Sequence, residues 1–309
     1  MRILRHAPSG GTPTAIAIGS FDGVHRGHAA ILERVGAAAR ALGAASAVLT
    51  FEPLPRELFA PGKAPARLTS LAERLAELAR RGVDIAFVER FDARYASLDA
   101  DAFARRLRTH HGARLVVVGA DFRYGAGRAG DVAALARAGR ALGFEVETVA
   151  AVADATERIS STRVREALAR GDFEAAARLL GRPYAICGRV VHGAKRGRGL
   201  GYPTANVRLG RPRAALNGIF AVKCHGVATR GLEGVASLGI NPAVQVGGPA
   251  SLEAFLFDFS GELYGRRVSI EFLKKLRDEA HFASLDELAA QIERDCDAAR
   301  AYFLAPGRR

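Results

Sequence analysis

The amino-acid sequence predicts an α/β domain built on a parallel sheet, followed by a small antiparallel β-barrel and a C-terminal helix. From Thr14 to about Leu180, apolar strand-like runs alternate with Ala-, Leu- and Arg-rich segments of helical spacing, which is typical of a parallel α/β sheet. After Gly181 the runs become short and β-rich, and Gly, Pro and Asn-Gly turns separate them, which indicates a barrel. We therefore expect a boundary near Gly181, with domains of residues 1–181 and 182–309.

The expected elements of the first domain follow from apolar spacing and stop signals. Leu71, Leu75 and Leu78 fall on one helical face and Gly82 follows them, so a helix is predicted there. A second helix begins near Thr162 and ends at Gly171-Asp172. The predicted strands are residues 15–18, 47–51, 115–118 and 146–149.

The second domain is expected to contain short strands and one long helix. Ser284 and Glu287 form a capping box, which marks the start of the helix. Its apolar residues share one face, which we expect to pack on the barrel: Leu285, Leu288, Ile292, Ala299 and Phe303. The predicted strands are residues 186–191, 219–224, 234–238, 252–259 and 268–272.

Length and composition suit a two-domain protein of 309 residues, 49% of them hydrophobic. No apolar run approaches the roughly 20 residues that a membrane span needs. Met1 to His6 is followed by a polar stretch with Pro and Gly and not by the core of a signal peptide, so we expect a cytoplasmic protein without a membrane partner. The three cysteines form no CxxC pair, so neither a disulfide framework nor a zinc site is expected.

The formal net charge of +13 suits a polyanionic partner such as nucleic acid, an anionic membrane surface or a polyphosphate. The excess is mostly Arg and accompanies heavy Ala usage, so a general compositional bias explains it equally well. The chain has no long Lys or Arg run, no Trp and no recognisable RNA-binding motif, so nucleic acid is not the expected partner. The sequence leaves the oligomeric state open.

A first candidate site follows the strand at residues 15–18, where GSFDGVHRGH leads into a helical segment that begins at Ala29. His25 and His28 are three apart at a helix start, where backbone N–H groups and the helix dipole favour phosphate and disfavour a protonated histidine. We therefore expect neutral imidazoles that donate hydrogen bonds to a phosphate. The alternative is that they only cap or pack, and zinc is disfavoured because no third ligand lies nearby.

Two further segments suit the same site. ISSTRVR places Arg163 and Arg165 in the first turn of a helix, where the dipole disfavours a cation unless an anion is bound. Hydroxyls and arginines there indicate a triphosphate clamp, whereas the simpler alternative is an N-cap. VVGADFRYG, which contains Asp121, follows a buried strand at its carboxyl end, where open α/β sheets bind ligands. Alone this signal is weak, because such turns are common.

A second candidate site lies in residues 192–206, a basic, glycine-dense loop that ends in a Pro-Thr turn. Thr204 and Asn206 place two oxygen ligands on one side of a short extended segment, which suits a magnesium ion that arrives with ATP. An ordinary surface loop is the alternative.

These motifs resemble the bacterial bifunctional riboflavin kinase/FMN adenylyltransferases, the prokaryotic FAD synthetases, over nearly the whole chain. GSFDGVHRGH is similar to the family's HxGH signature, VVGADFRYG to its flavin and nucleotide loop, ISSTRVR to its phosphate-binding motif and GRGLGYPTANV to the PTAN motif of flavokinases. The resemblance implies a Rossmann-like nucleotidyltransferase domain and a β-barrel riboflavin kinase domain. It also implies riboflavin, FMN and ATP as substrates, with Mg²⁺.

The resemblance implies a role for each candidate residue. Glu253 stands where flavokinases have their catalytic glutamate, although a Glu in a strand would otherwise be read as a solvated residue. The implied catalytic residues are Glu253, His25, His28 and Arg165. The implied ATP and phosphate contacts are Gly19, Phe21, Asp22, Gly27, Ser161, Thr162, Gly193, Arg198 and Gly199. The implied flavin contacts are Asp121, Phe122, Arg277 and Phe282, and the implied metal ligands are Thr204 and Asn206.

The sequence departs from the family pattern at two places. Leu54 stands where the family commonly has a histidine, which affects a flavin-side contact and is not read as a loss of activity. Residues 237–243 read SLGINPA where relatives usually have Asn-Ile-Gly-x-Arg-Pro-Thr, so one alternative is an FMN adenylyltransferase with a weakened kinase domain. A second alternative, which uses the +13 charge, is a flavin- or RNA-binding regulatory protein with salt-sensitive RNA binding and no turnover.

Overall fold

The computed structural model describes residues 1–5, 10–193, 201–239 and 250–305. The chain forms two compact units, one of residues 1–65 with 74–160, the other of residues 66–73 with 161–309. The helices α7 (Ser161–Ala169) and α8 (Phe173–Leu180) therefore group with the second unit, whereas the predicted boundary at Gly181 follows them.

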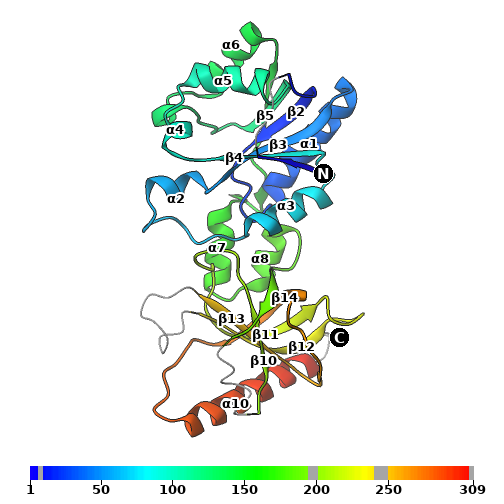
Figure 1. Ribbon diagram of the computed structural model, residues 1–309, viewed down its shortest axis with the longest axis vertical. Coiled ribbons are helices and arrows are strands. Elements are labelled where there is room, and N and C mark those ends of the chain that lie inside the picture. The colour runs from blue at the N-terminus through cyan, green and yellow to red at the C-terminus, as the bar shows by residue number, and fades with distance from the viewer. Residues whose placement is uncertain (6–9, 194–200, 240–249, 306–309) are drawn as a thin grey trace. The chain divides into compact units, whose positions relative to one another are not determined.

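The first unit contains the predicted parallel sheet, with strand order β1-β4-β3-β2-β5-β6 (Figure 1). All five pairings are parallel. The four predicted strands are confirmed as β2, β3, β5 and β6, and the structure adds β1 and β4. The bounds are β1 Arg2–Leu4, β2 Thr14–Ile18, β3 Ala45–Glu52, β4 Ile85–Arg90, β5 Ala113–Gly119 and β6 Glu145–Val149.

Helices cover both faces of this sheet, which explains why β2 is buried along its whole length. Leu32 of α1 and Leu78 of α3 pack on one face. Phe103 of α5 and Leu135 of α6 pack on the other. The helix predicted before Gly82 is confirmed as α3. The bounds are α1 Arg26–Leu42, α3 Leu71–Arg80, α5 Ala100–Thr109 and α6 Val132–Leu142, with the short α2 Pro55–Phe59 and α4 Ala93–Ala96.

The second unit contains a closed antiparallel barrel in the order β10-β13-β12-β11-β14-β9. The strand predicted at residues 252–259 is shorter than expected, because β13 ends at Leu256. Phe173 of α8 packs against Phe220 and Phe272 of the barrel. The bounds are β9 Ala185–Val191, β10 Thr204–Val207, β11 Gly218–His225, β12 Leu232–Gly239, β13 Ser251–Leu256 and β14 Arg267–Arg277.

The C-terminal helix α10 (Leu285–Leu304) packs on the barrel, as predicted. Ser284 caps it by accepting the Glu287 N–H at 3.1 Å. Cys296, Ala299 and Phe303 of α10 form a core with residues of β11 and β12. The expectation that Leu285 packs on the barrel is wrong, because this residue is 67% exposed, and its neighbours in the first turn of α10 are exposed as well.

Candidate active sites

The order of the parallel strands brings two predicted motifs to one edge of the sheet. The chain passes from β2 to β3 and β4 on one side, then crosses to β5 on the other side of β2. Ligands of open α/β sheets bind in the crevice at such a switch point, beyond the carboxyl ends of the strands. Gly19 follows β2 and Asp121 follows β5. The two segments therefore lie at the same crevice.

The turn between β2 and α1 has an unusual backbone. Phe21 has a φ of 49° and Val24 a φ of 42°, in the left-handed region that residues with a side chain rarely adopt. Each such residue costs on the order of 1–3 kcal/mol, which the surrounding structure must offset, and strain of this kind is concentrated at functional sites. Both side chains are fully buried in the core beneath α1. The helix begins at Arg26 and not at the predicted Ala29, because His25 caps it.

Hydrogen bonding defines the state of the His25 imidazole. Its Nδ1 accepts the backbone N–H of His28 at 3.3 Å, so Nδ1 is unprotonated and Nε2 carries the donor proton. The rings of His25 and His28 stack with their centroids 3.7 Å apart and an interplanar angle of 16°. The buried Nδ1 of His28 has no hydrogen-bond partner among the residues that the structure describes.

His28 is held in its neutral form. Burial is the main reason that its pKa lies well below the usual range. Protonation of His25 would lower the pKa further, and the charges of Arg81 and Arg158 also lower it. A neutral imidazole agrees with the expectation from the helix dipole.

A side chain at two of the predicted phosphate-site glycines would crowd a neighbouring ring. A Cβ at Gly27 would lie 3.2 Å from the His25 ring, and one at Gly19 would lie 3.3 Å from the Phe21 ring. Glycine at both positions therefore lets the rings lie close to the backbone. Asp22, between them, is buried.

Arg158 of the hairpin β7–β8 (Ala153–Asp154 and Glu157–Arg158) was not identified from the sequence. It donates two hydrogen bonds to Asp121, at 2.8 and 3.1 Å, and this pairing lowers the pKa of the Asp121 carboxyl. Its neighbour Ile159 lies close to Gly27. Arg158 therefore lies between the turn that carries His25 and His28 and the end of β5. Its position directly before ISSTRVR was the one sequence signal for it. The ring of Phe122 stacks on Tyr124 nearby.

Ser161, Thr162 and Arg165 lie in the first turns of α7, as predicted, and no acidic residue occupies its first turn. They belong to the second compact unit, whereas His25 and His28 belong to the first. Arg165 donates through Nε to the carbonyl of Ala66 at 2.6 Å within that second unit. Leu54, at the histidine position of the family, is buried at the start of α2 in the first unit.

In the barrel, strand register brings three oxygen-bearing side chains together. Asn206 of β10 lies directly opposite Glu253 of β13, and the hydroxyl of Thr204 donates to the Glu253 carboxylate at 3.2 Å. Leu252 and Ala254 are buried in the barrel, so the half-buried Glu253 between them faces outward. Thr204 and Asn206 alternate in the same way and share its side of the wall.

The backbone of Gly193 packs directly on the Asn206 side chain, where a Cβ would overlap the amide group. The ring centroids of the preceding residue, His192, and of Tyr264 lie 3.9 Å apart. Arg198 and Gly199 lie outside the described residues, as do residues 240–243 of the departing loop. Ser237, the first residue of that loop, is opposite Glu253 in β12.

The predicted flavin contact Arg277 is heavily engaged with other residues. Its Nε and Nη2 donate to Asp295 of α10 at 2.8 and 2.7 Å, and its Nη1 donates to the Asp278 carbonyl at 2.9 Å. The guanidinium also lies 5.7 Å from the centre of the Phe282 ring. Arg277 therefore connects β14 to α10 and packs against the Phe282 ring.

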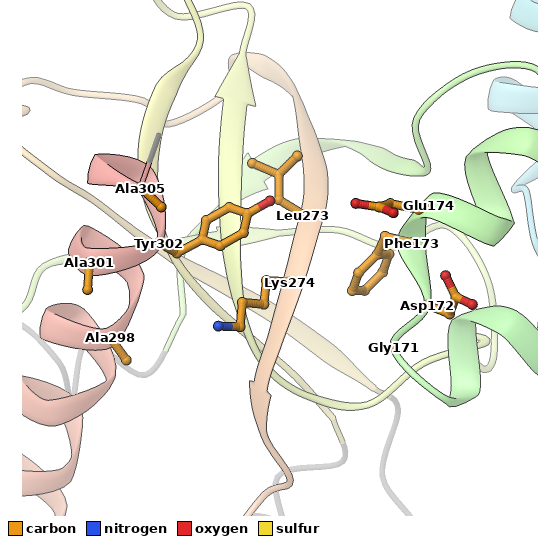
Figure 2. A pocket seen from close by; sticks show the side chains of 10 residues that line it. All are labelled: Gly171, Asp172, Phe173, Glu174, Leu273, Lys274, Ala298, Ala301, Tyr302 and Ala305. Carbon is orange, nitrogen blue, oxygen red and sulfur yellow. The ribbon is translucent and has the colours of Figure 1, made fainter. Parts of the chain in front are cut away.

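A separate cavity of about 520 Å³ lies between the α7–α8 turn, β14 and α10 (Figure 2). Asp172 and Glu174 line one side, and Lys274, which lies 5.7 Å from the Tyr302 ring centre, lines another. β14 lies across the barrel from β13. This cavity is therefore distinct from the wall that carries Glu253.

Neutral imidazoles at a helix start and an oxygen-rich barrel wall both suit phosphate transfer, so the two units define an enzyme class with two phosphate-handling sites. Residues 8–163 match the family model of FAD synthetase and residues 180–303 match that of riboflavin kinase. The chain belongs to the bifunctional riboflavin kinase/FMN adenylyltransferase family. These two activities together place it in FAD biosynthesis.

The relatives cover almost the whole chain. It is 46% identical to the bifunctional riboflavin kinase/FMN adenylyltransferase of Escherichia coli (strain K12), over 97% of this chain and 95% of the relative. The identity to the Pseudomonas fluorescens protein of the same name is 47%, over 92% and 91%. A solved structure described as a macrolide-efflux protein from Streptococcus pneumoniae superposes with a TM-score of 0.76 and 31% identity, covering 96% of this chain and 98% of that one.

In the described part of the chain, no helix combines the length and the apolar character needed to cross a membrane.

Proposed function

We propose that residues 1–181 transfer AMP from ATP to FMN and that residues 182–309 phosphorylate riboflavin with ATP. The stacked pair of His25 and His28 at the sheet's switch point is the observation that carries the first assignment. The hydrogen-bonded cluster of Thr204 and Glu253 beside Asn206 supports the second.

In adenylyl transfer, a phosphate oxygen of FMN attacks the α-phosphorus of ATP. A new P–O bond forms as the bond to the bridging oxygen breaks, and pyrophosphate leaves with the electron pair. The nucleophile is already an anion, so positioning and charge stabilisation are the main tasks. His25 through Nε2–H and the neutral His28 would donate hydrogen bonds to the α-phosphate oxygens.

The remaining predicted residues divide between the two substrates of this reaction. Ser161, Thr162 and Arg165 at the start of α7 would hold the departing pyrophosphate. Asp121 and Phe122 would contact the flavin. The close-packed turn after β2 would contact the nucleotide through Gly19, Phe21, Asp22 and Gly27.

In riboflavin phosphorylation, Glu253 would accept the proton of the ribityl 5'-hydroxyl as that oxygen attacks the γ-phosphorus and ADP leaves. Its carboxylate accepts a hydrogen bond from Thr204, which would orient it for this role. Arg277 and Phe282 would border the flavin. Gly193, Arg198 and Gly199 would contact the ATP phosphates.

The barrel wall has oxygen donors that fit magnesium. The Thr204 hydroxyl donates a hydrogen bond to Glu253, which leaves the lone pairs of the hydroxyl oxygen available, and the Asn206 carboxamide provides a second oxygen. Mg²⁺ prefers such ligands together with substrate phosphates. When bound with ATP, it would neutralise phosphate charge. The magnesium preference and the cytoplasmic location remain predictions.

The direct test is to incubate the purified protein with ATP and Mg²⁺, with riboflavin in one reaction and FMN in another, and to separate the flavins over time. We expect FMN and then FAD from riboflavin. FAD from FMN alone would support the alternative in which the departing loop has weakened the kinase. No turnover in either reaction would contradict the proposal.

A further inference from the structure

We propose that Arg74 is a positioning residue for adenylyl transfer. Its side chain holds the turn that carries His25 and His28. The inference rests on the adenylyl-transfer function proposed for the first unit. Arg74 lies on α3 and its side chain is 1% exposed. It therefore acts on the reaction through the turn and not by touching substrate.

The guanidinium connects two segments at the ligand-binding edge of the sheet. Nη1 donates to the carbonyl of Ser20, in the turn after β2, at 2.8 Å. Nη2 donates to the Phe51 carbonyl at 3.2 Å and to the Glu52 carboxylate at 3.1 Å, at the end of β3. A buried guanidinium is tolerated when it is paired and hydrogen-bonded, and Glu52 provides the opposite charge.

Two other hydrogen bonds connect the turn to β3. The Gly19 N–H donates to the Leu49 carbonyl at 3.1 Å, and the Thr50 hydroxyl donates to the Ser20 carbonyl at 3.4 Å. The contact from Arg74 to Ser20 is the shortest of the three and the only charged one among them. It therefore provides the firmest of these connections.

The turn requires such a connection because its conformation is strained. Phe21 and Val24 have positive φ angles between Ser20 and the cap residue His25. A strained backbone persists only where its surroundings hold it. Without Arg74 the turn would relax, and the stacked imidazoles would move from the positions in which both face the same phosphate.

The test compares Arg74→Met and Arg74→Lys with the wild-type protein, measuring kcat and KM for FAD formation from FMN. A misplacement of about 1 Å can cost about 100-fold in rate, so we expect Arg74→Met to lower kcat by about 10- to 100-fold with a much smaller change in KM. Arg74→Lys should recover part of the loss, because an ammonium can reach one carbonyl but lacks the fork that binds both segments.

Riboflavin phosphorylation in the same preparations serves as an internal control and should be unchanged. Arg80→Met is the matched substitution, because Arg80 lies on the same helix with a 66% exposed side chain. It should not alter kcat. If Arg74→Met does not fold, Thr50→Val removes another hydrogen bond to Ser20 and should give a smaller fall in kcat.

Two results would overturn the inference. One is a wild-type kcat in a folded Arg74→Met protein. The other is a parallel loss of both activities and of thermal stability in which Arg74→Lys is no better than Arg74→Met, since this would make Arg74 a structural residue only. A wild-type protein that forms no FAD would instead contradict the proposed function itself.

Discussion

The candidate adenylyl-transfer site and the candidate kinase site are constructed from different parts of the backbone. In the α/β unit, the groups come from the ends of parallel strands and the start of α1, and a strained turn sets the positions of His25 and His28. In the barrel, they come from the middle of adjacent antiparallel strands, where Asn206 faces Glu253. The first site should therefore depend on the turn, whereas the second should depend on strand register.

The largest expected effect is the loss of riboflavin phosphorylation, without loss of FAD formation, when the barrel site is altered. Glu253→Gln should lower riboflavin phosphorylation by about 100- to 10,000-fold, because a positioned general base contributes that much. FAD formation from supplied FMN should be unchanged. Glu233→Gln is the control, because Glu233 lies on the neighbouring β12 and pairs with Lys223. Near-normal phosphorylation in Glu253→Gln would remove this residue from its assigned role.

In the α/β unit we expect the opposite result, a loss of FAD formation without loss of riboflavin phosphorylation. His28→Ala should lower FAD formation from FMN by about 100- to 1,000-fold, the usual cost of losing one donor to a developing oxyanion. Riboflavin phosphorylation should be unaffected. His225→Ala, at a partly exposed histidine of the barrel, should change neither rate. Loss of both activities in a folded His28→Ala protein would contradict independent sites.

A smaller effect tests whether backbone packing also matters in the barrel. Gly193→Ala should lower riboflavin phosphorylation by about 10-fold or more, because its Cβ would displace the Asn206 amide from its place beside Glu253. Gly62→Ala is the control, since a Cβ there meets nothing within 4 Å. A fully active Gly193→Ala enzyme would show that the kinase site depends on side-chain register alone.

The smallest effect is on stability and concerns the lowered pKa of His28. The unfolded chain binds a proton at this residue below about pH 6.5, whereas the folded protein does so only at lower pH. The contribution of the neutral ring is therefore complete above pH 6.5 and is lost as the pH falls below it. In denaturant titrations between pH 7.5 and pH 5, the free energy of unfolding should fall less for His28→Gln than for the wild type. An equal loss in both proteins would contradict a lowered pKa.

The sequence by itself determined the local features of both sites. Apolar spacing and a following glycine predicted α3, the capping box predicted the start of α10, and the glycine-rich turn placed two histidines at the start of α1. Each of these signals depends on residues within a few positions of one another, because turns, caps and helix faces are formed by chain neighbours.

Only the tertiary structure decided which distant segments meet. The hydrogen bond between Thr204 and Glu253 joins residues 49 positions apart, and that between Arg74 and Ser20 joins residues 54 apart. The placement of β5 beside β2, and the pairing of Arg158 with Asp121, are likewise long-range. A charged residue on a helix is ordinarily read as solvated, so nothing local marked Arg74 as buried. Its burial results from the way α3 packs against the turn after β2 and the end of β3, which are distant from it in the sequence.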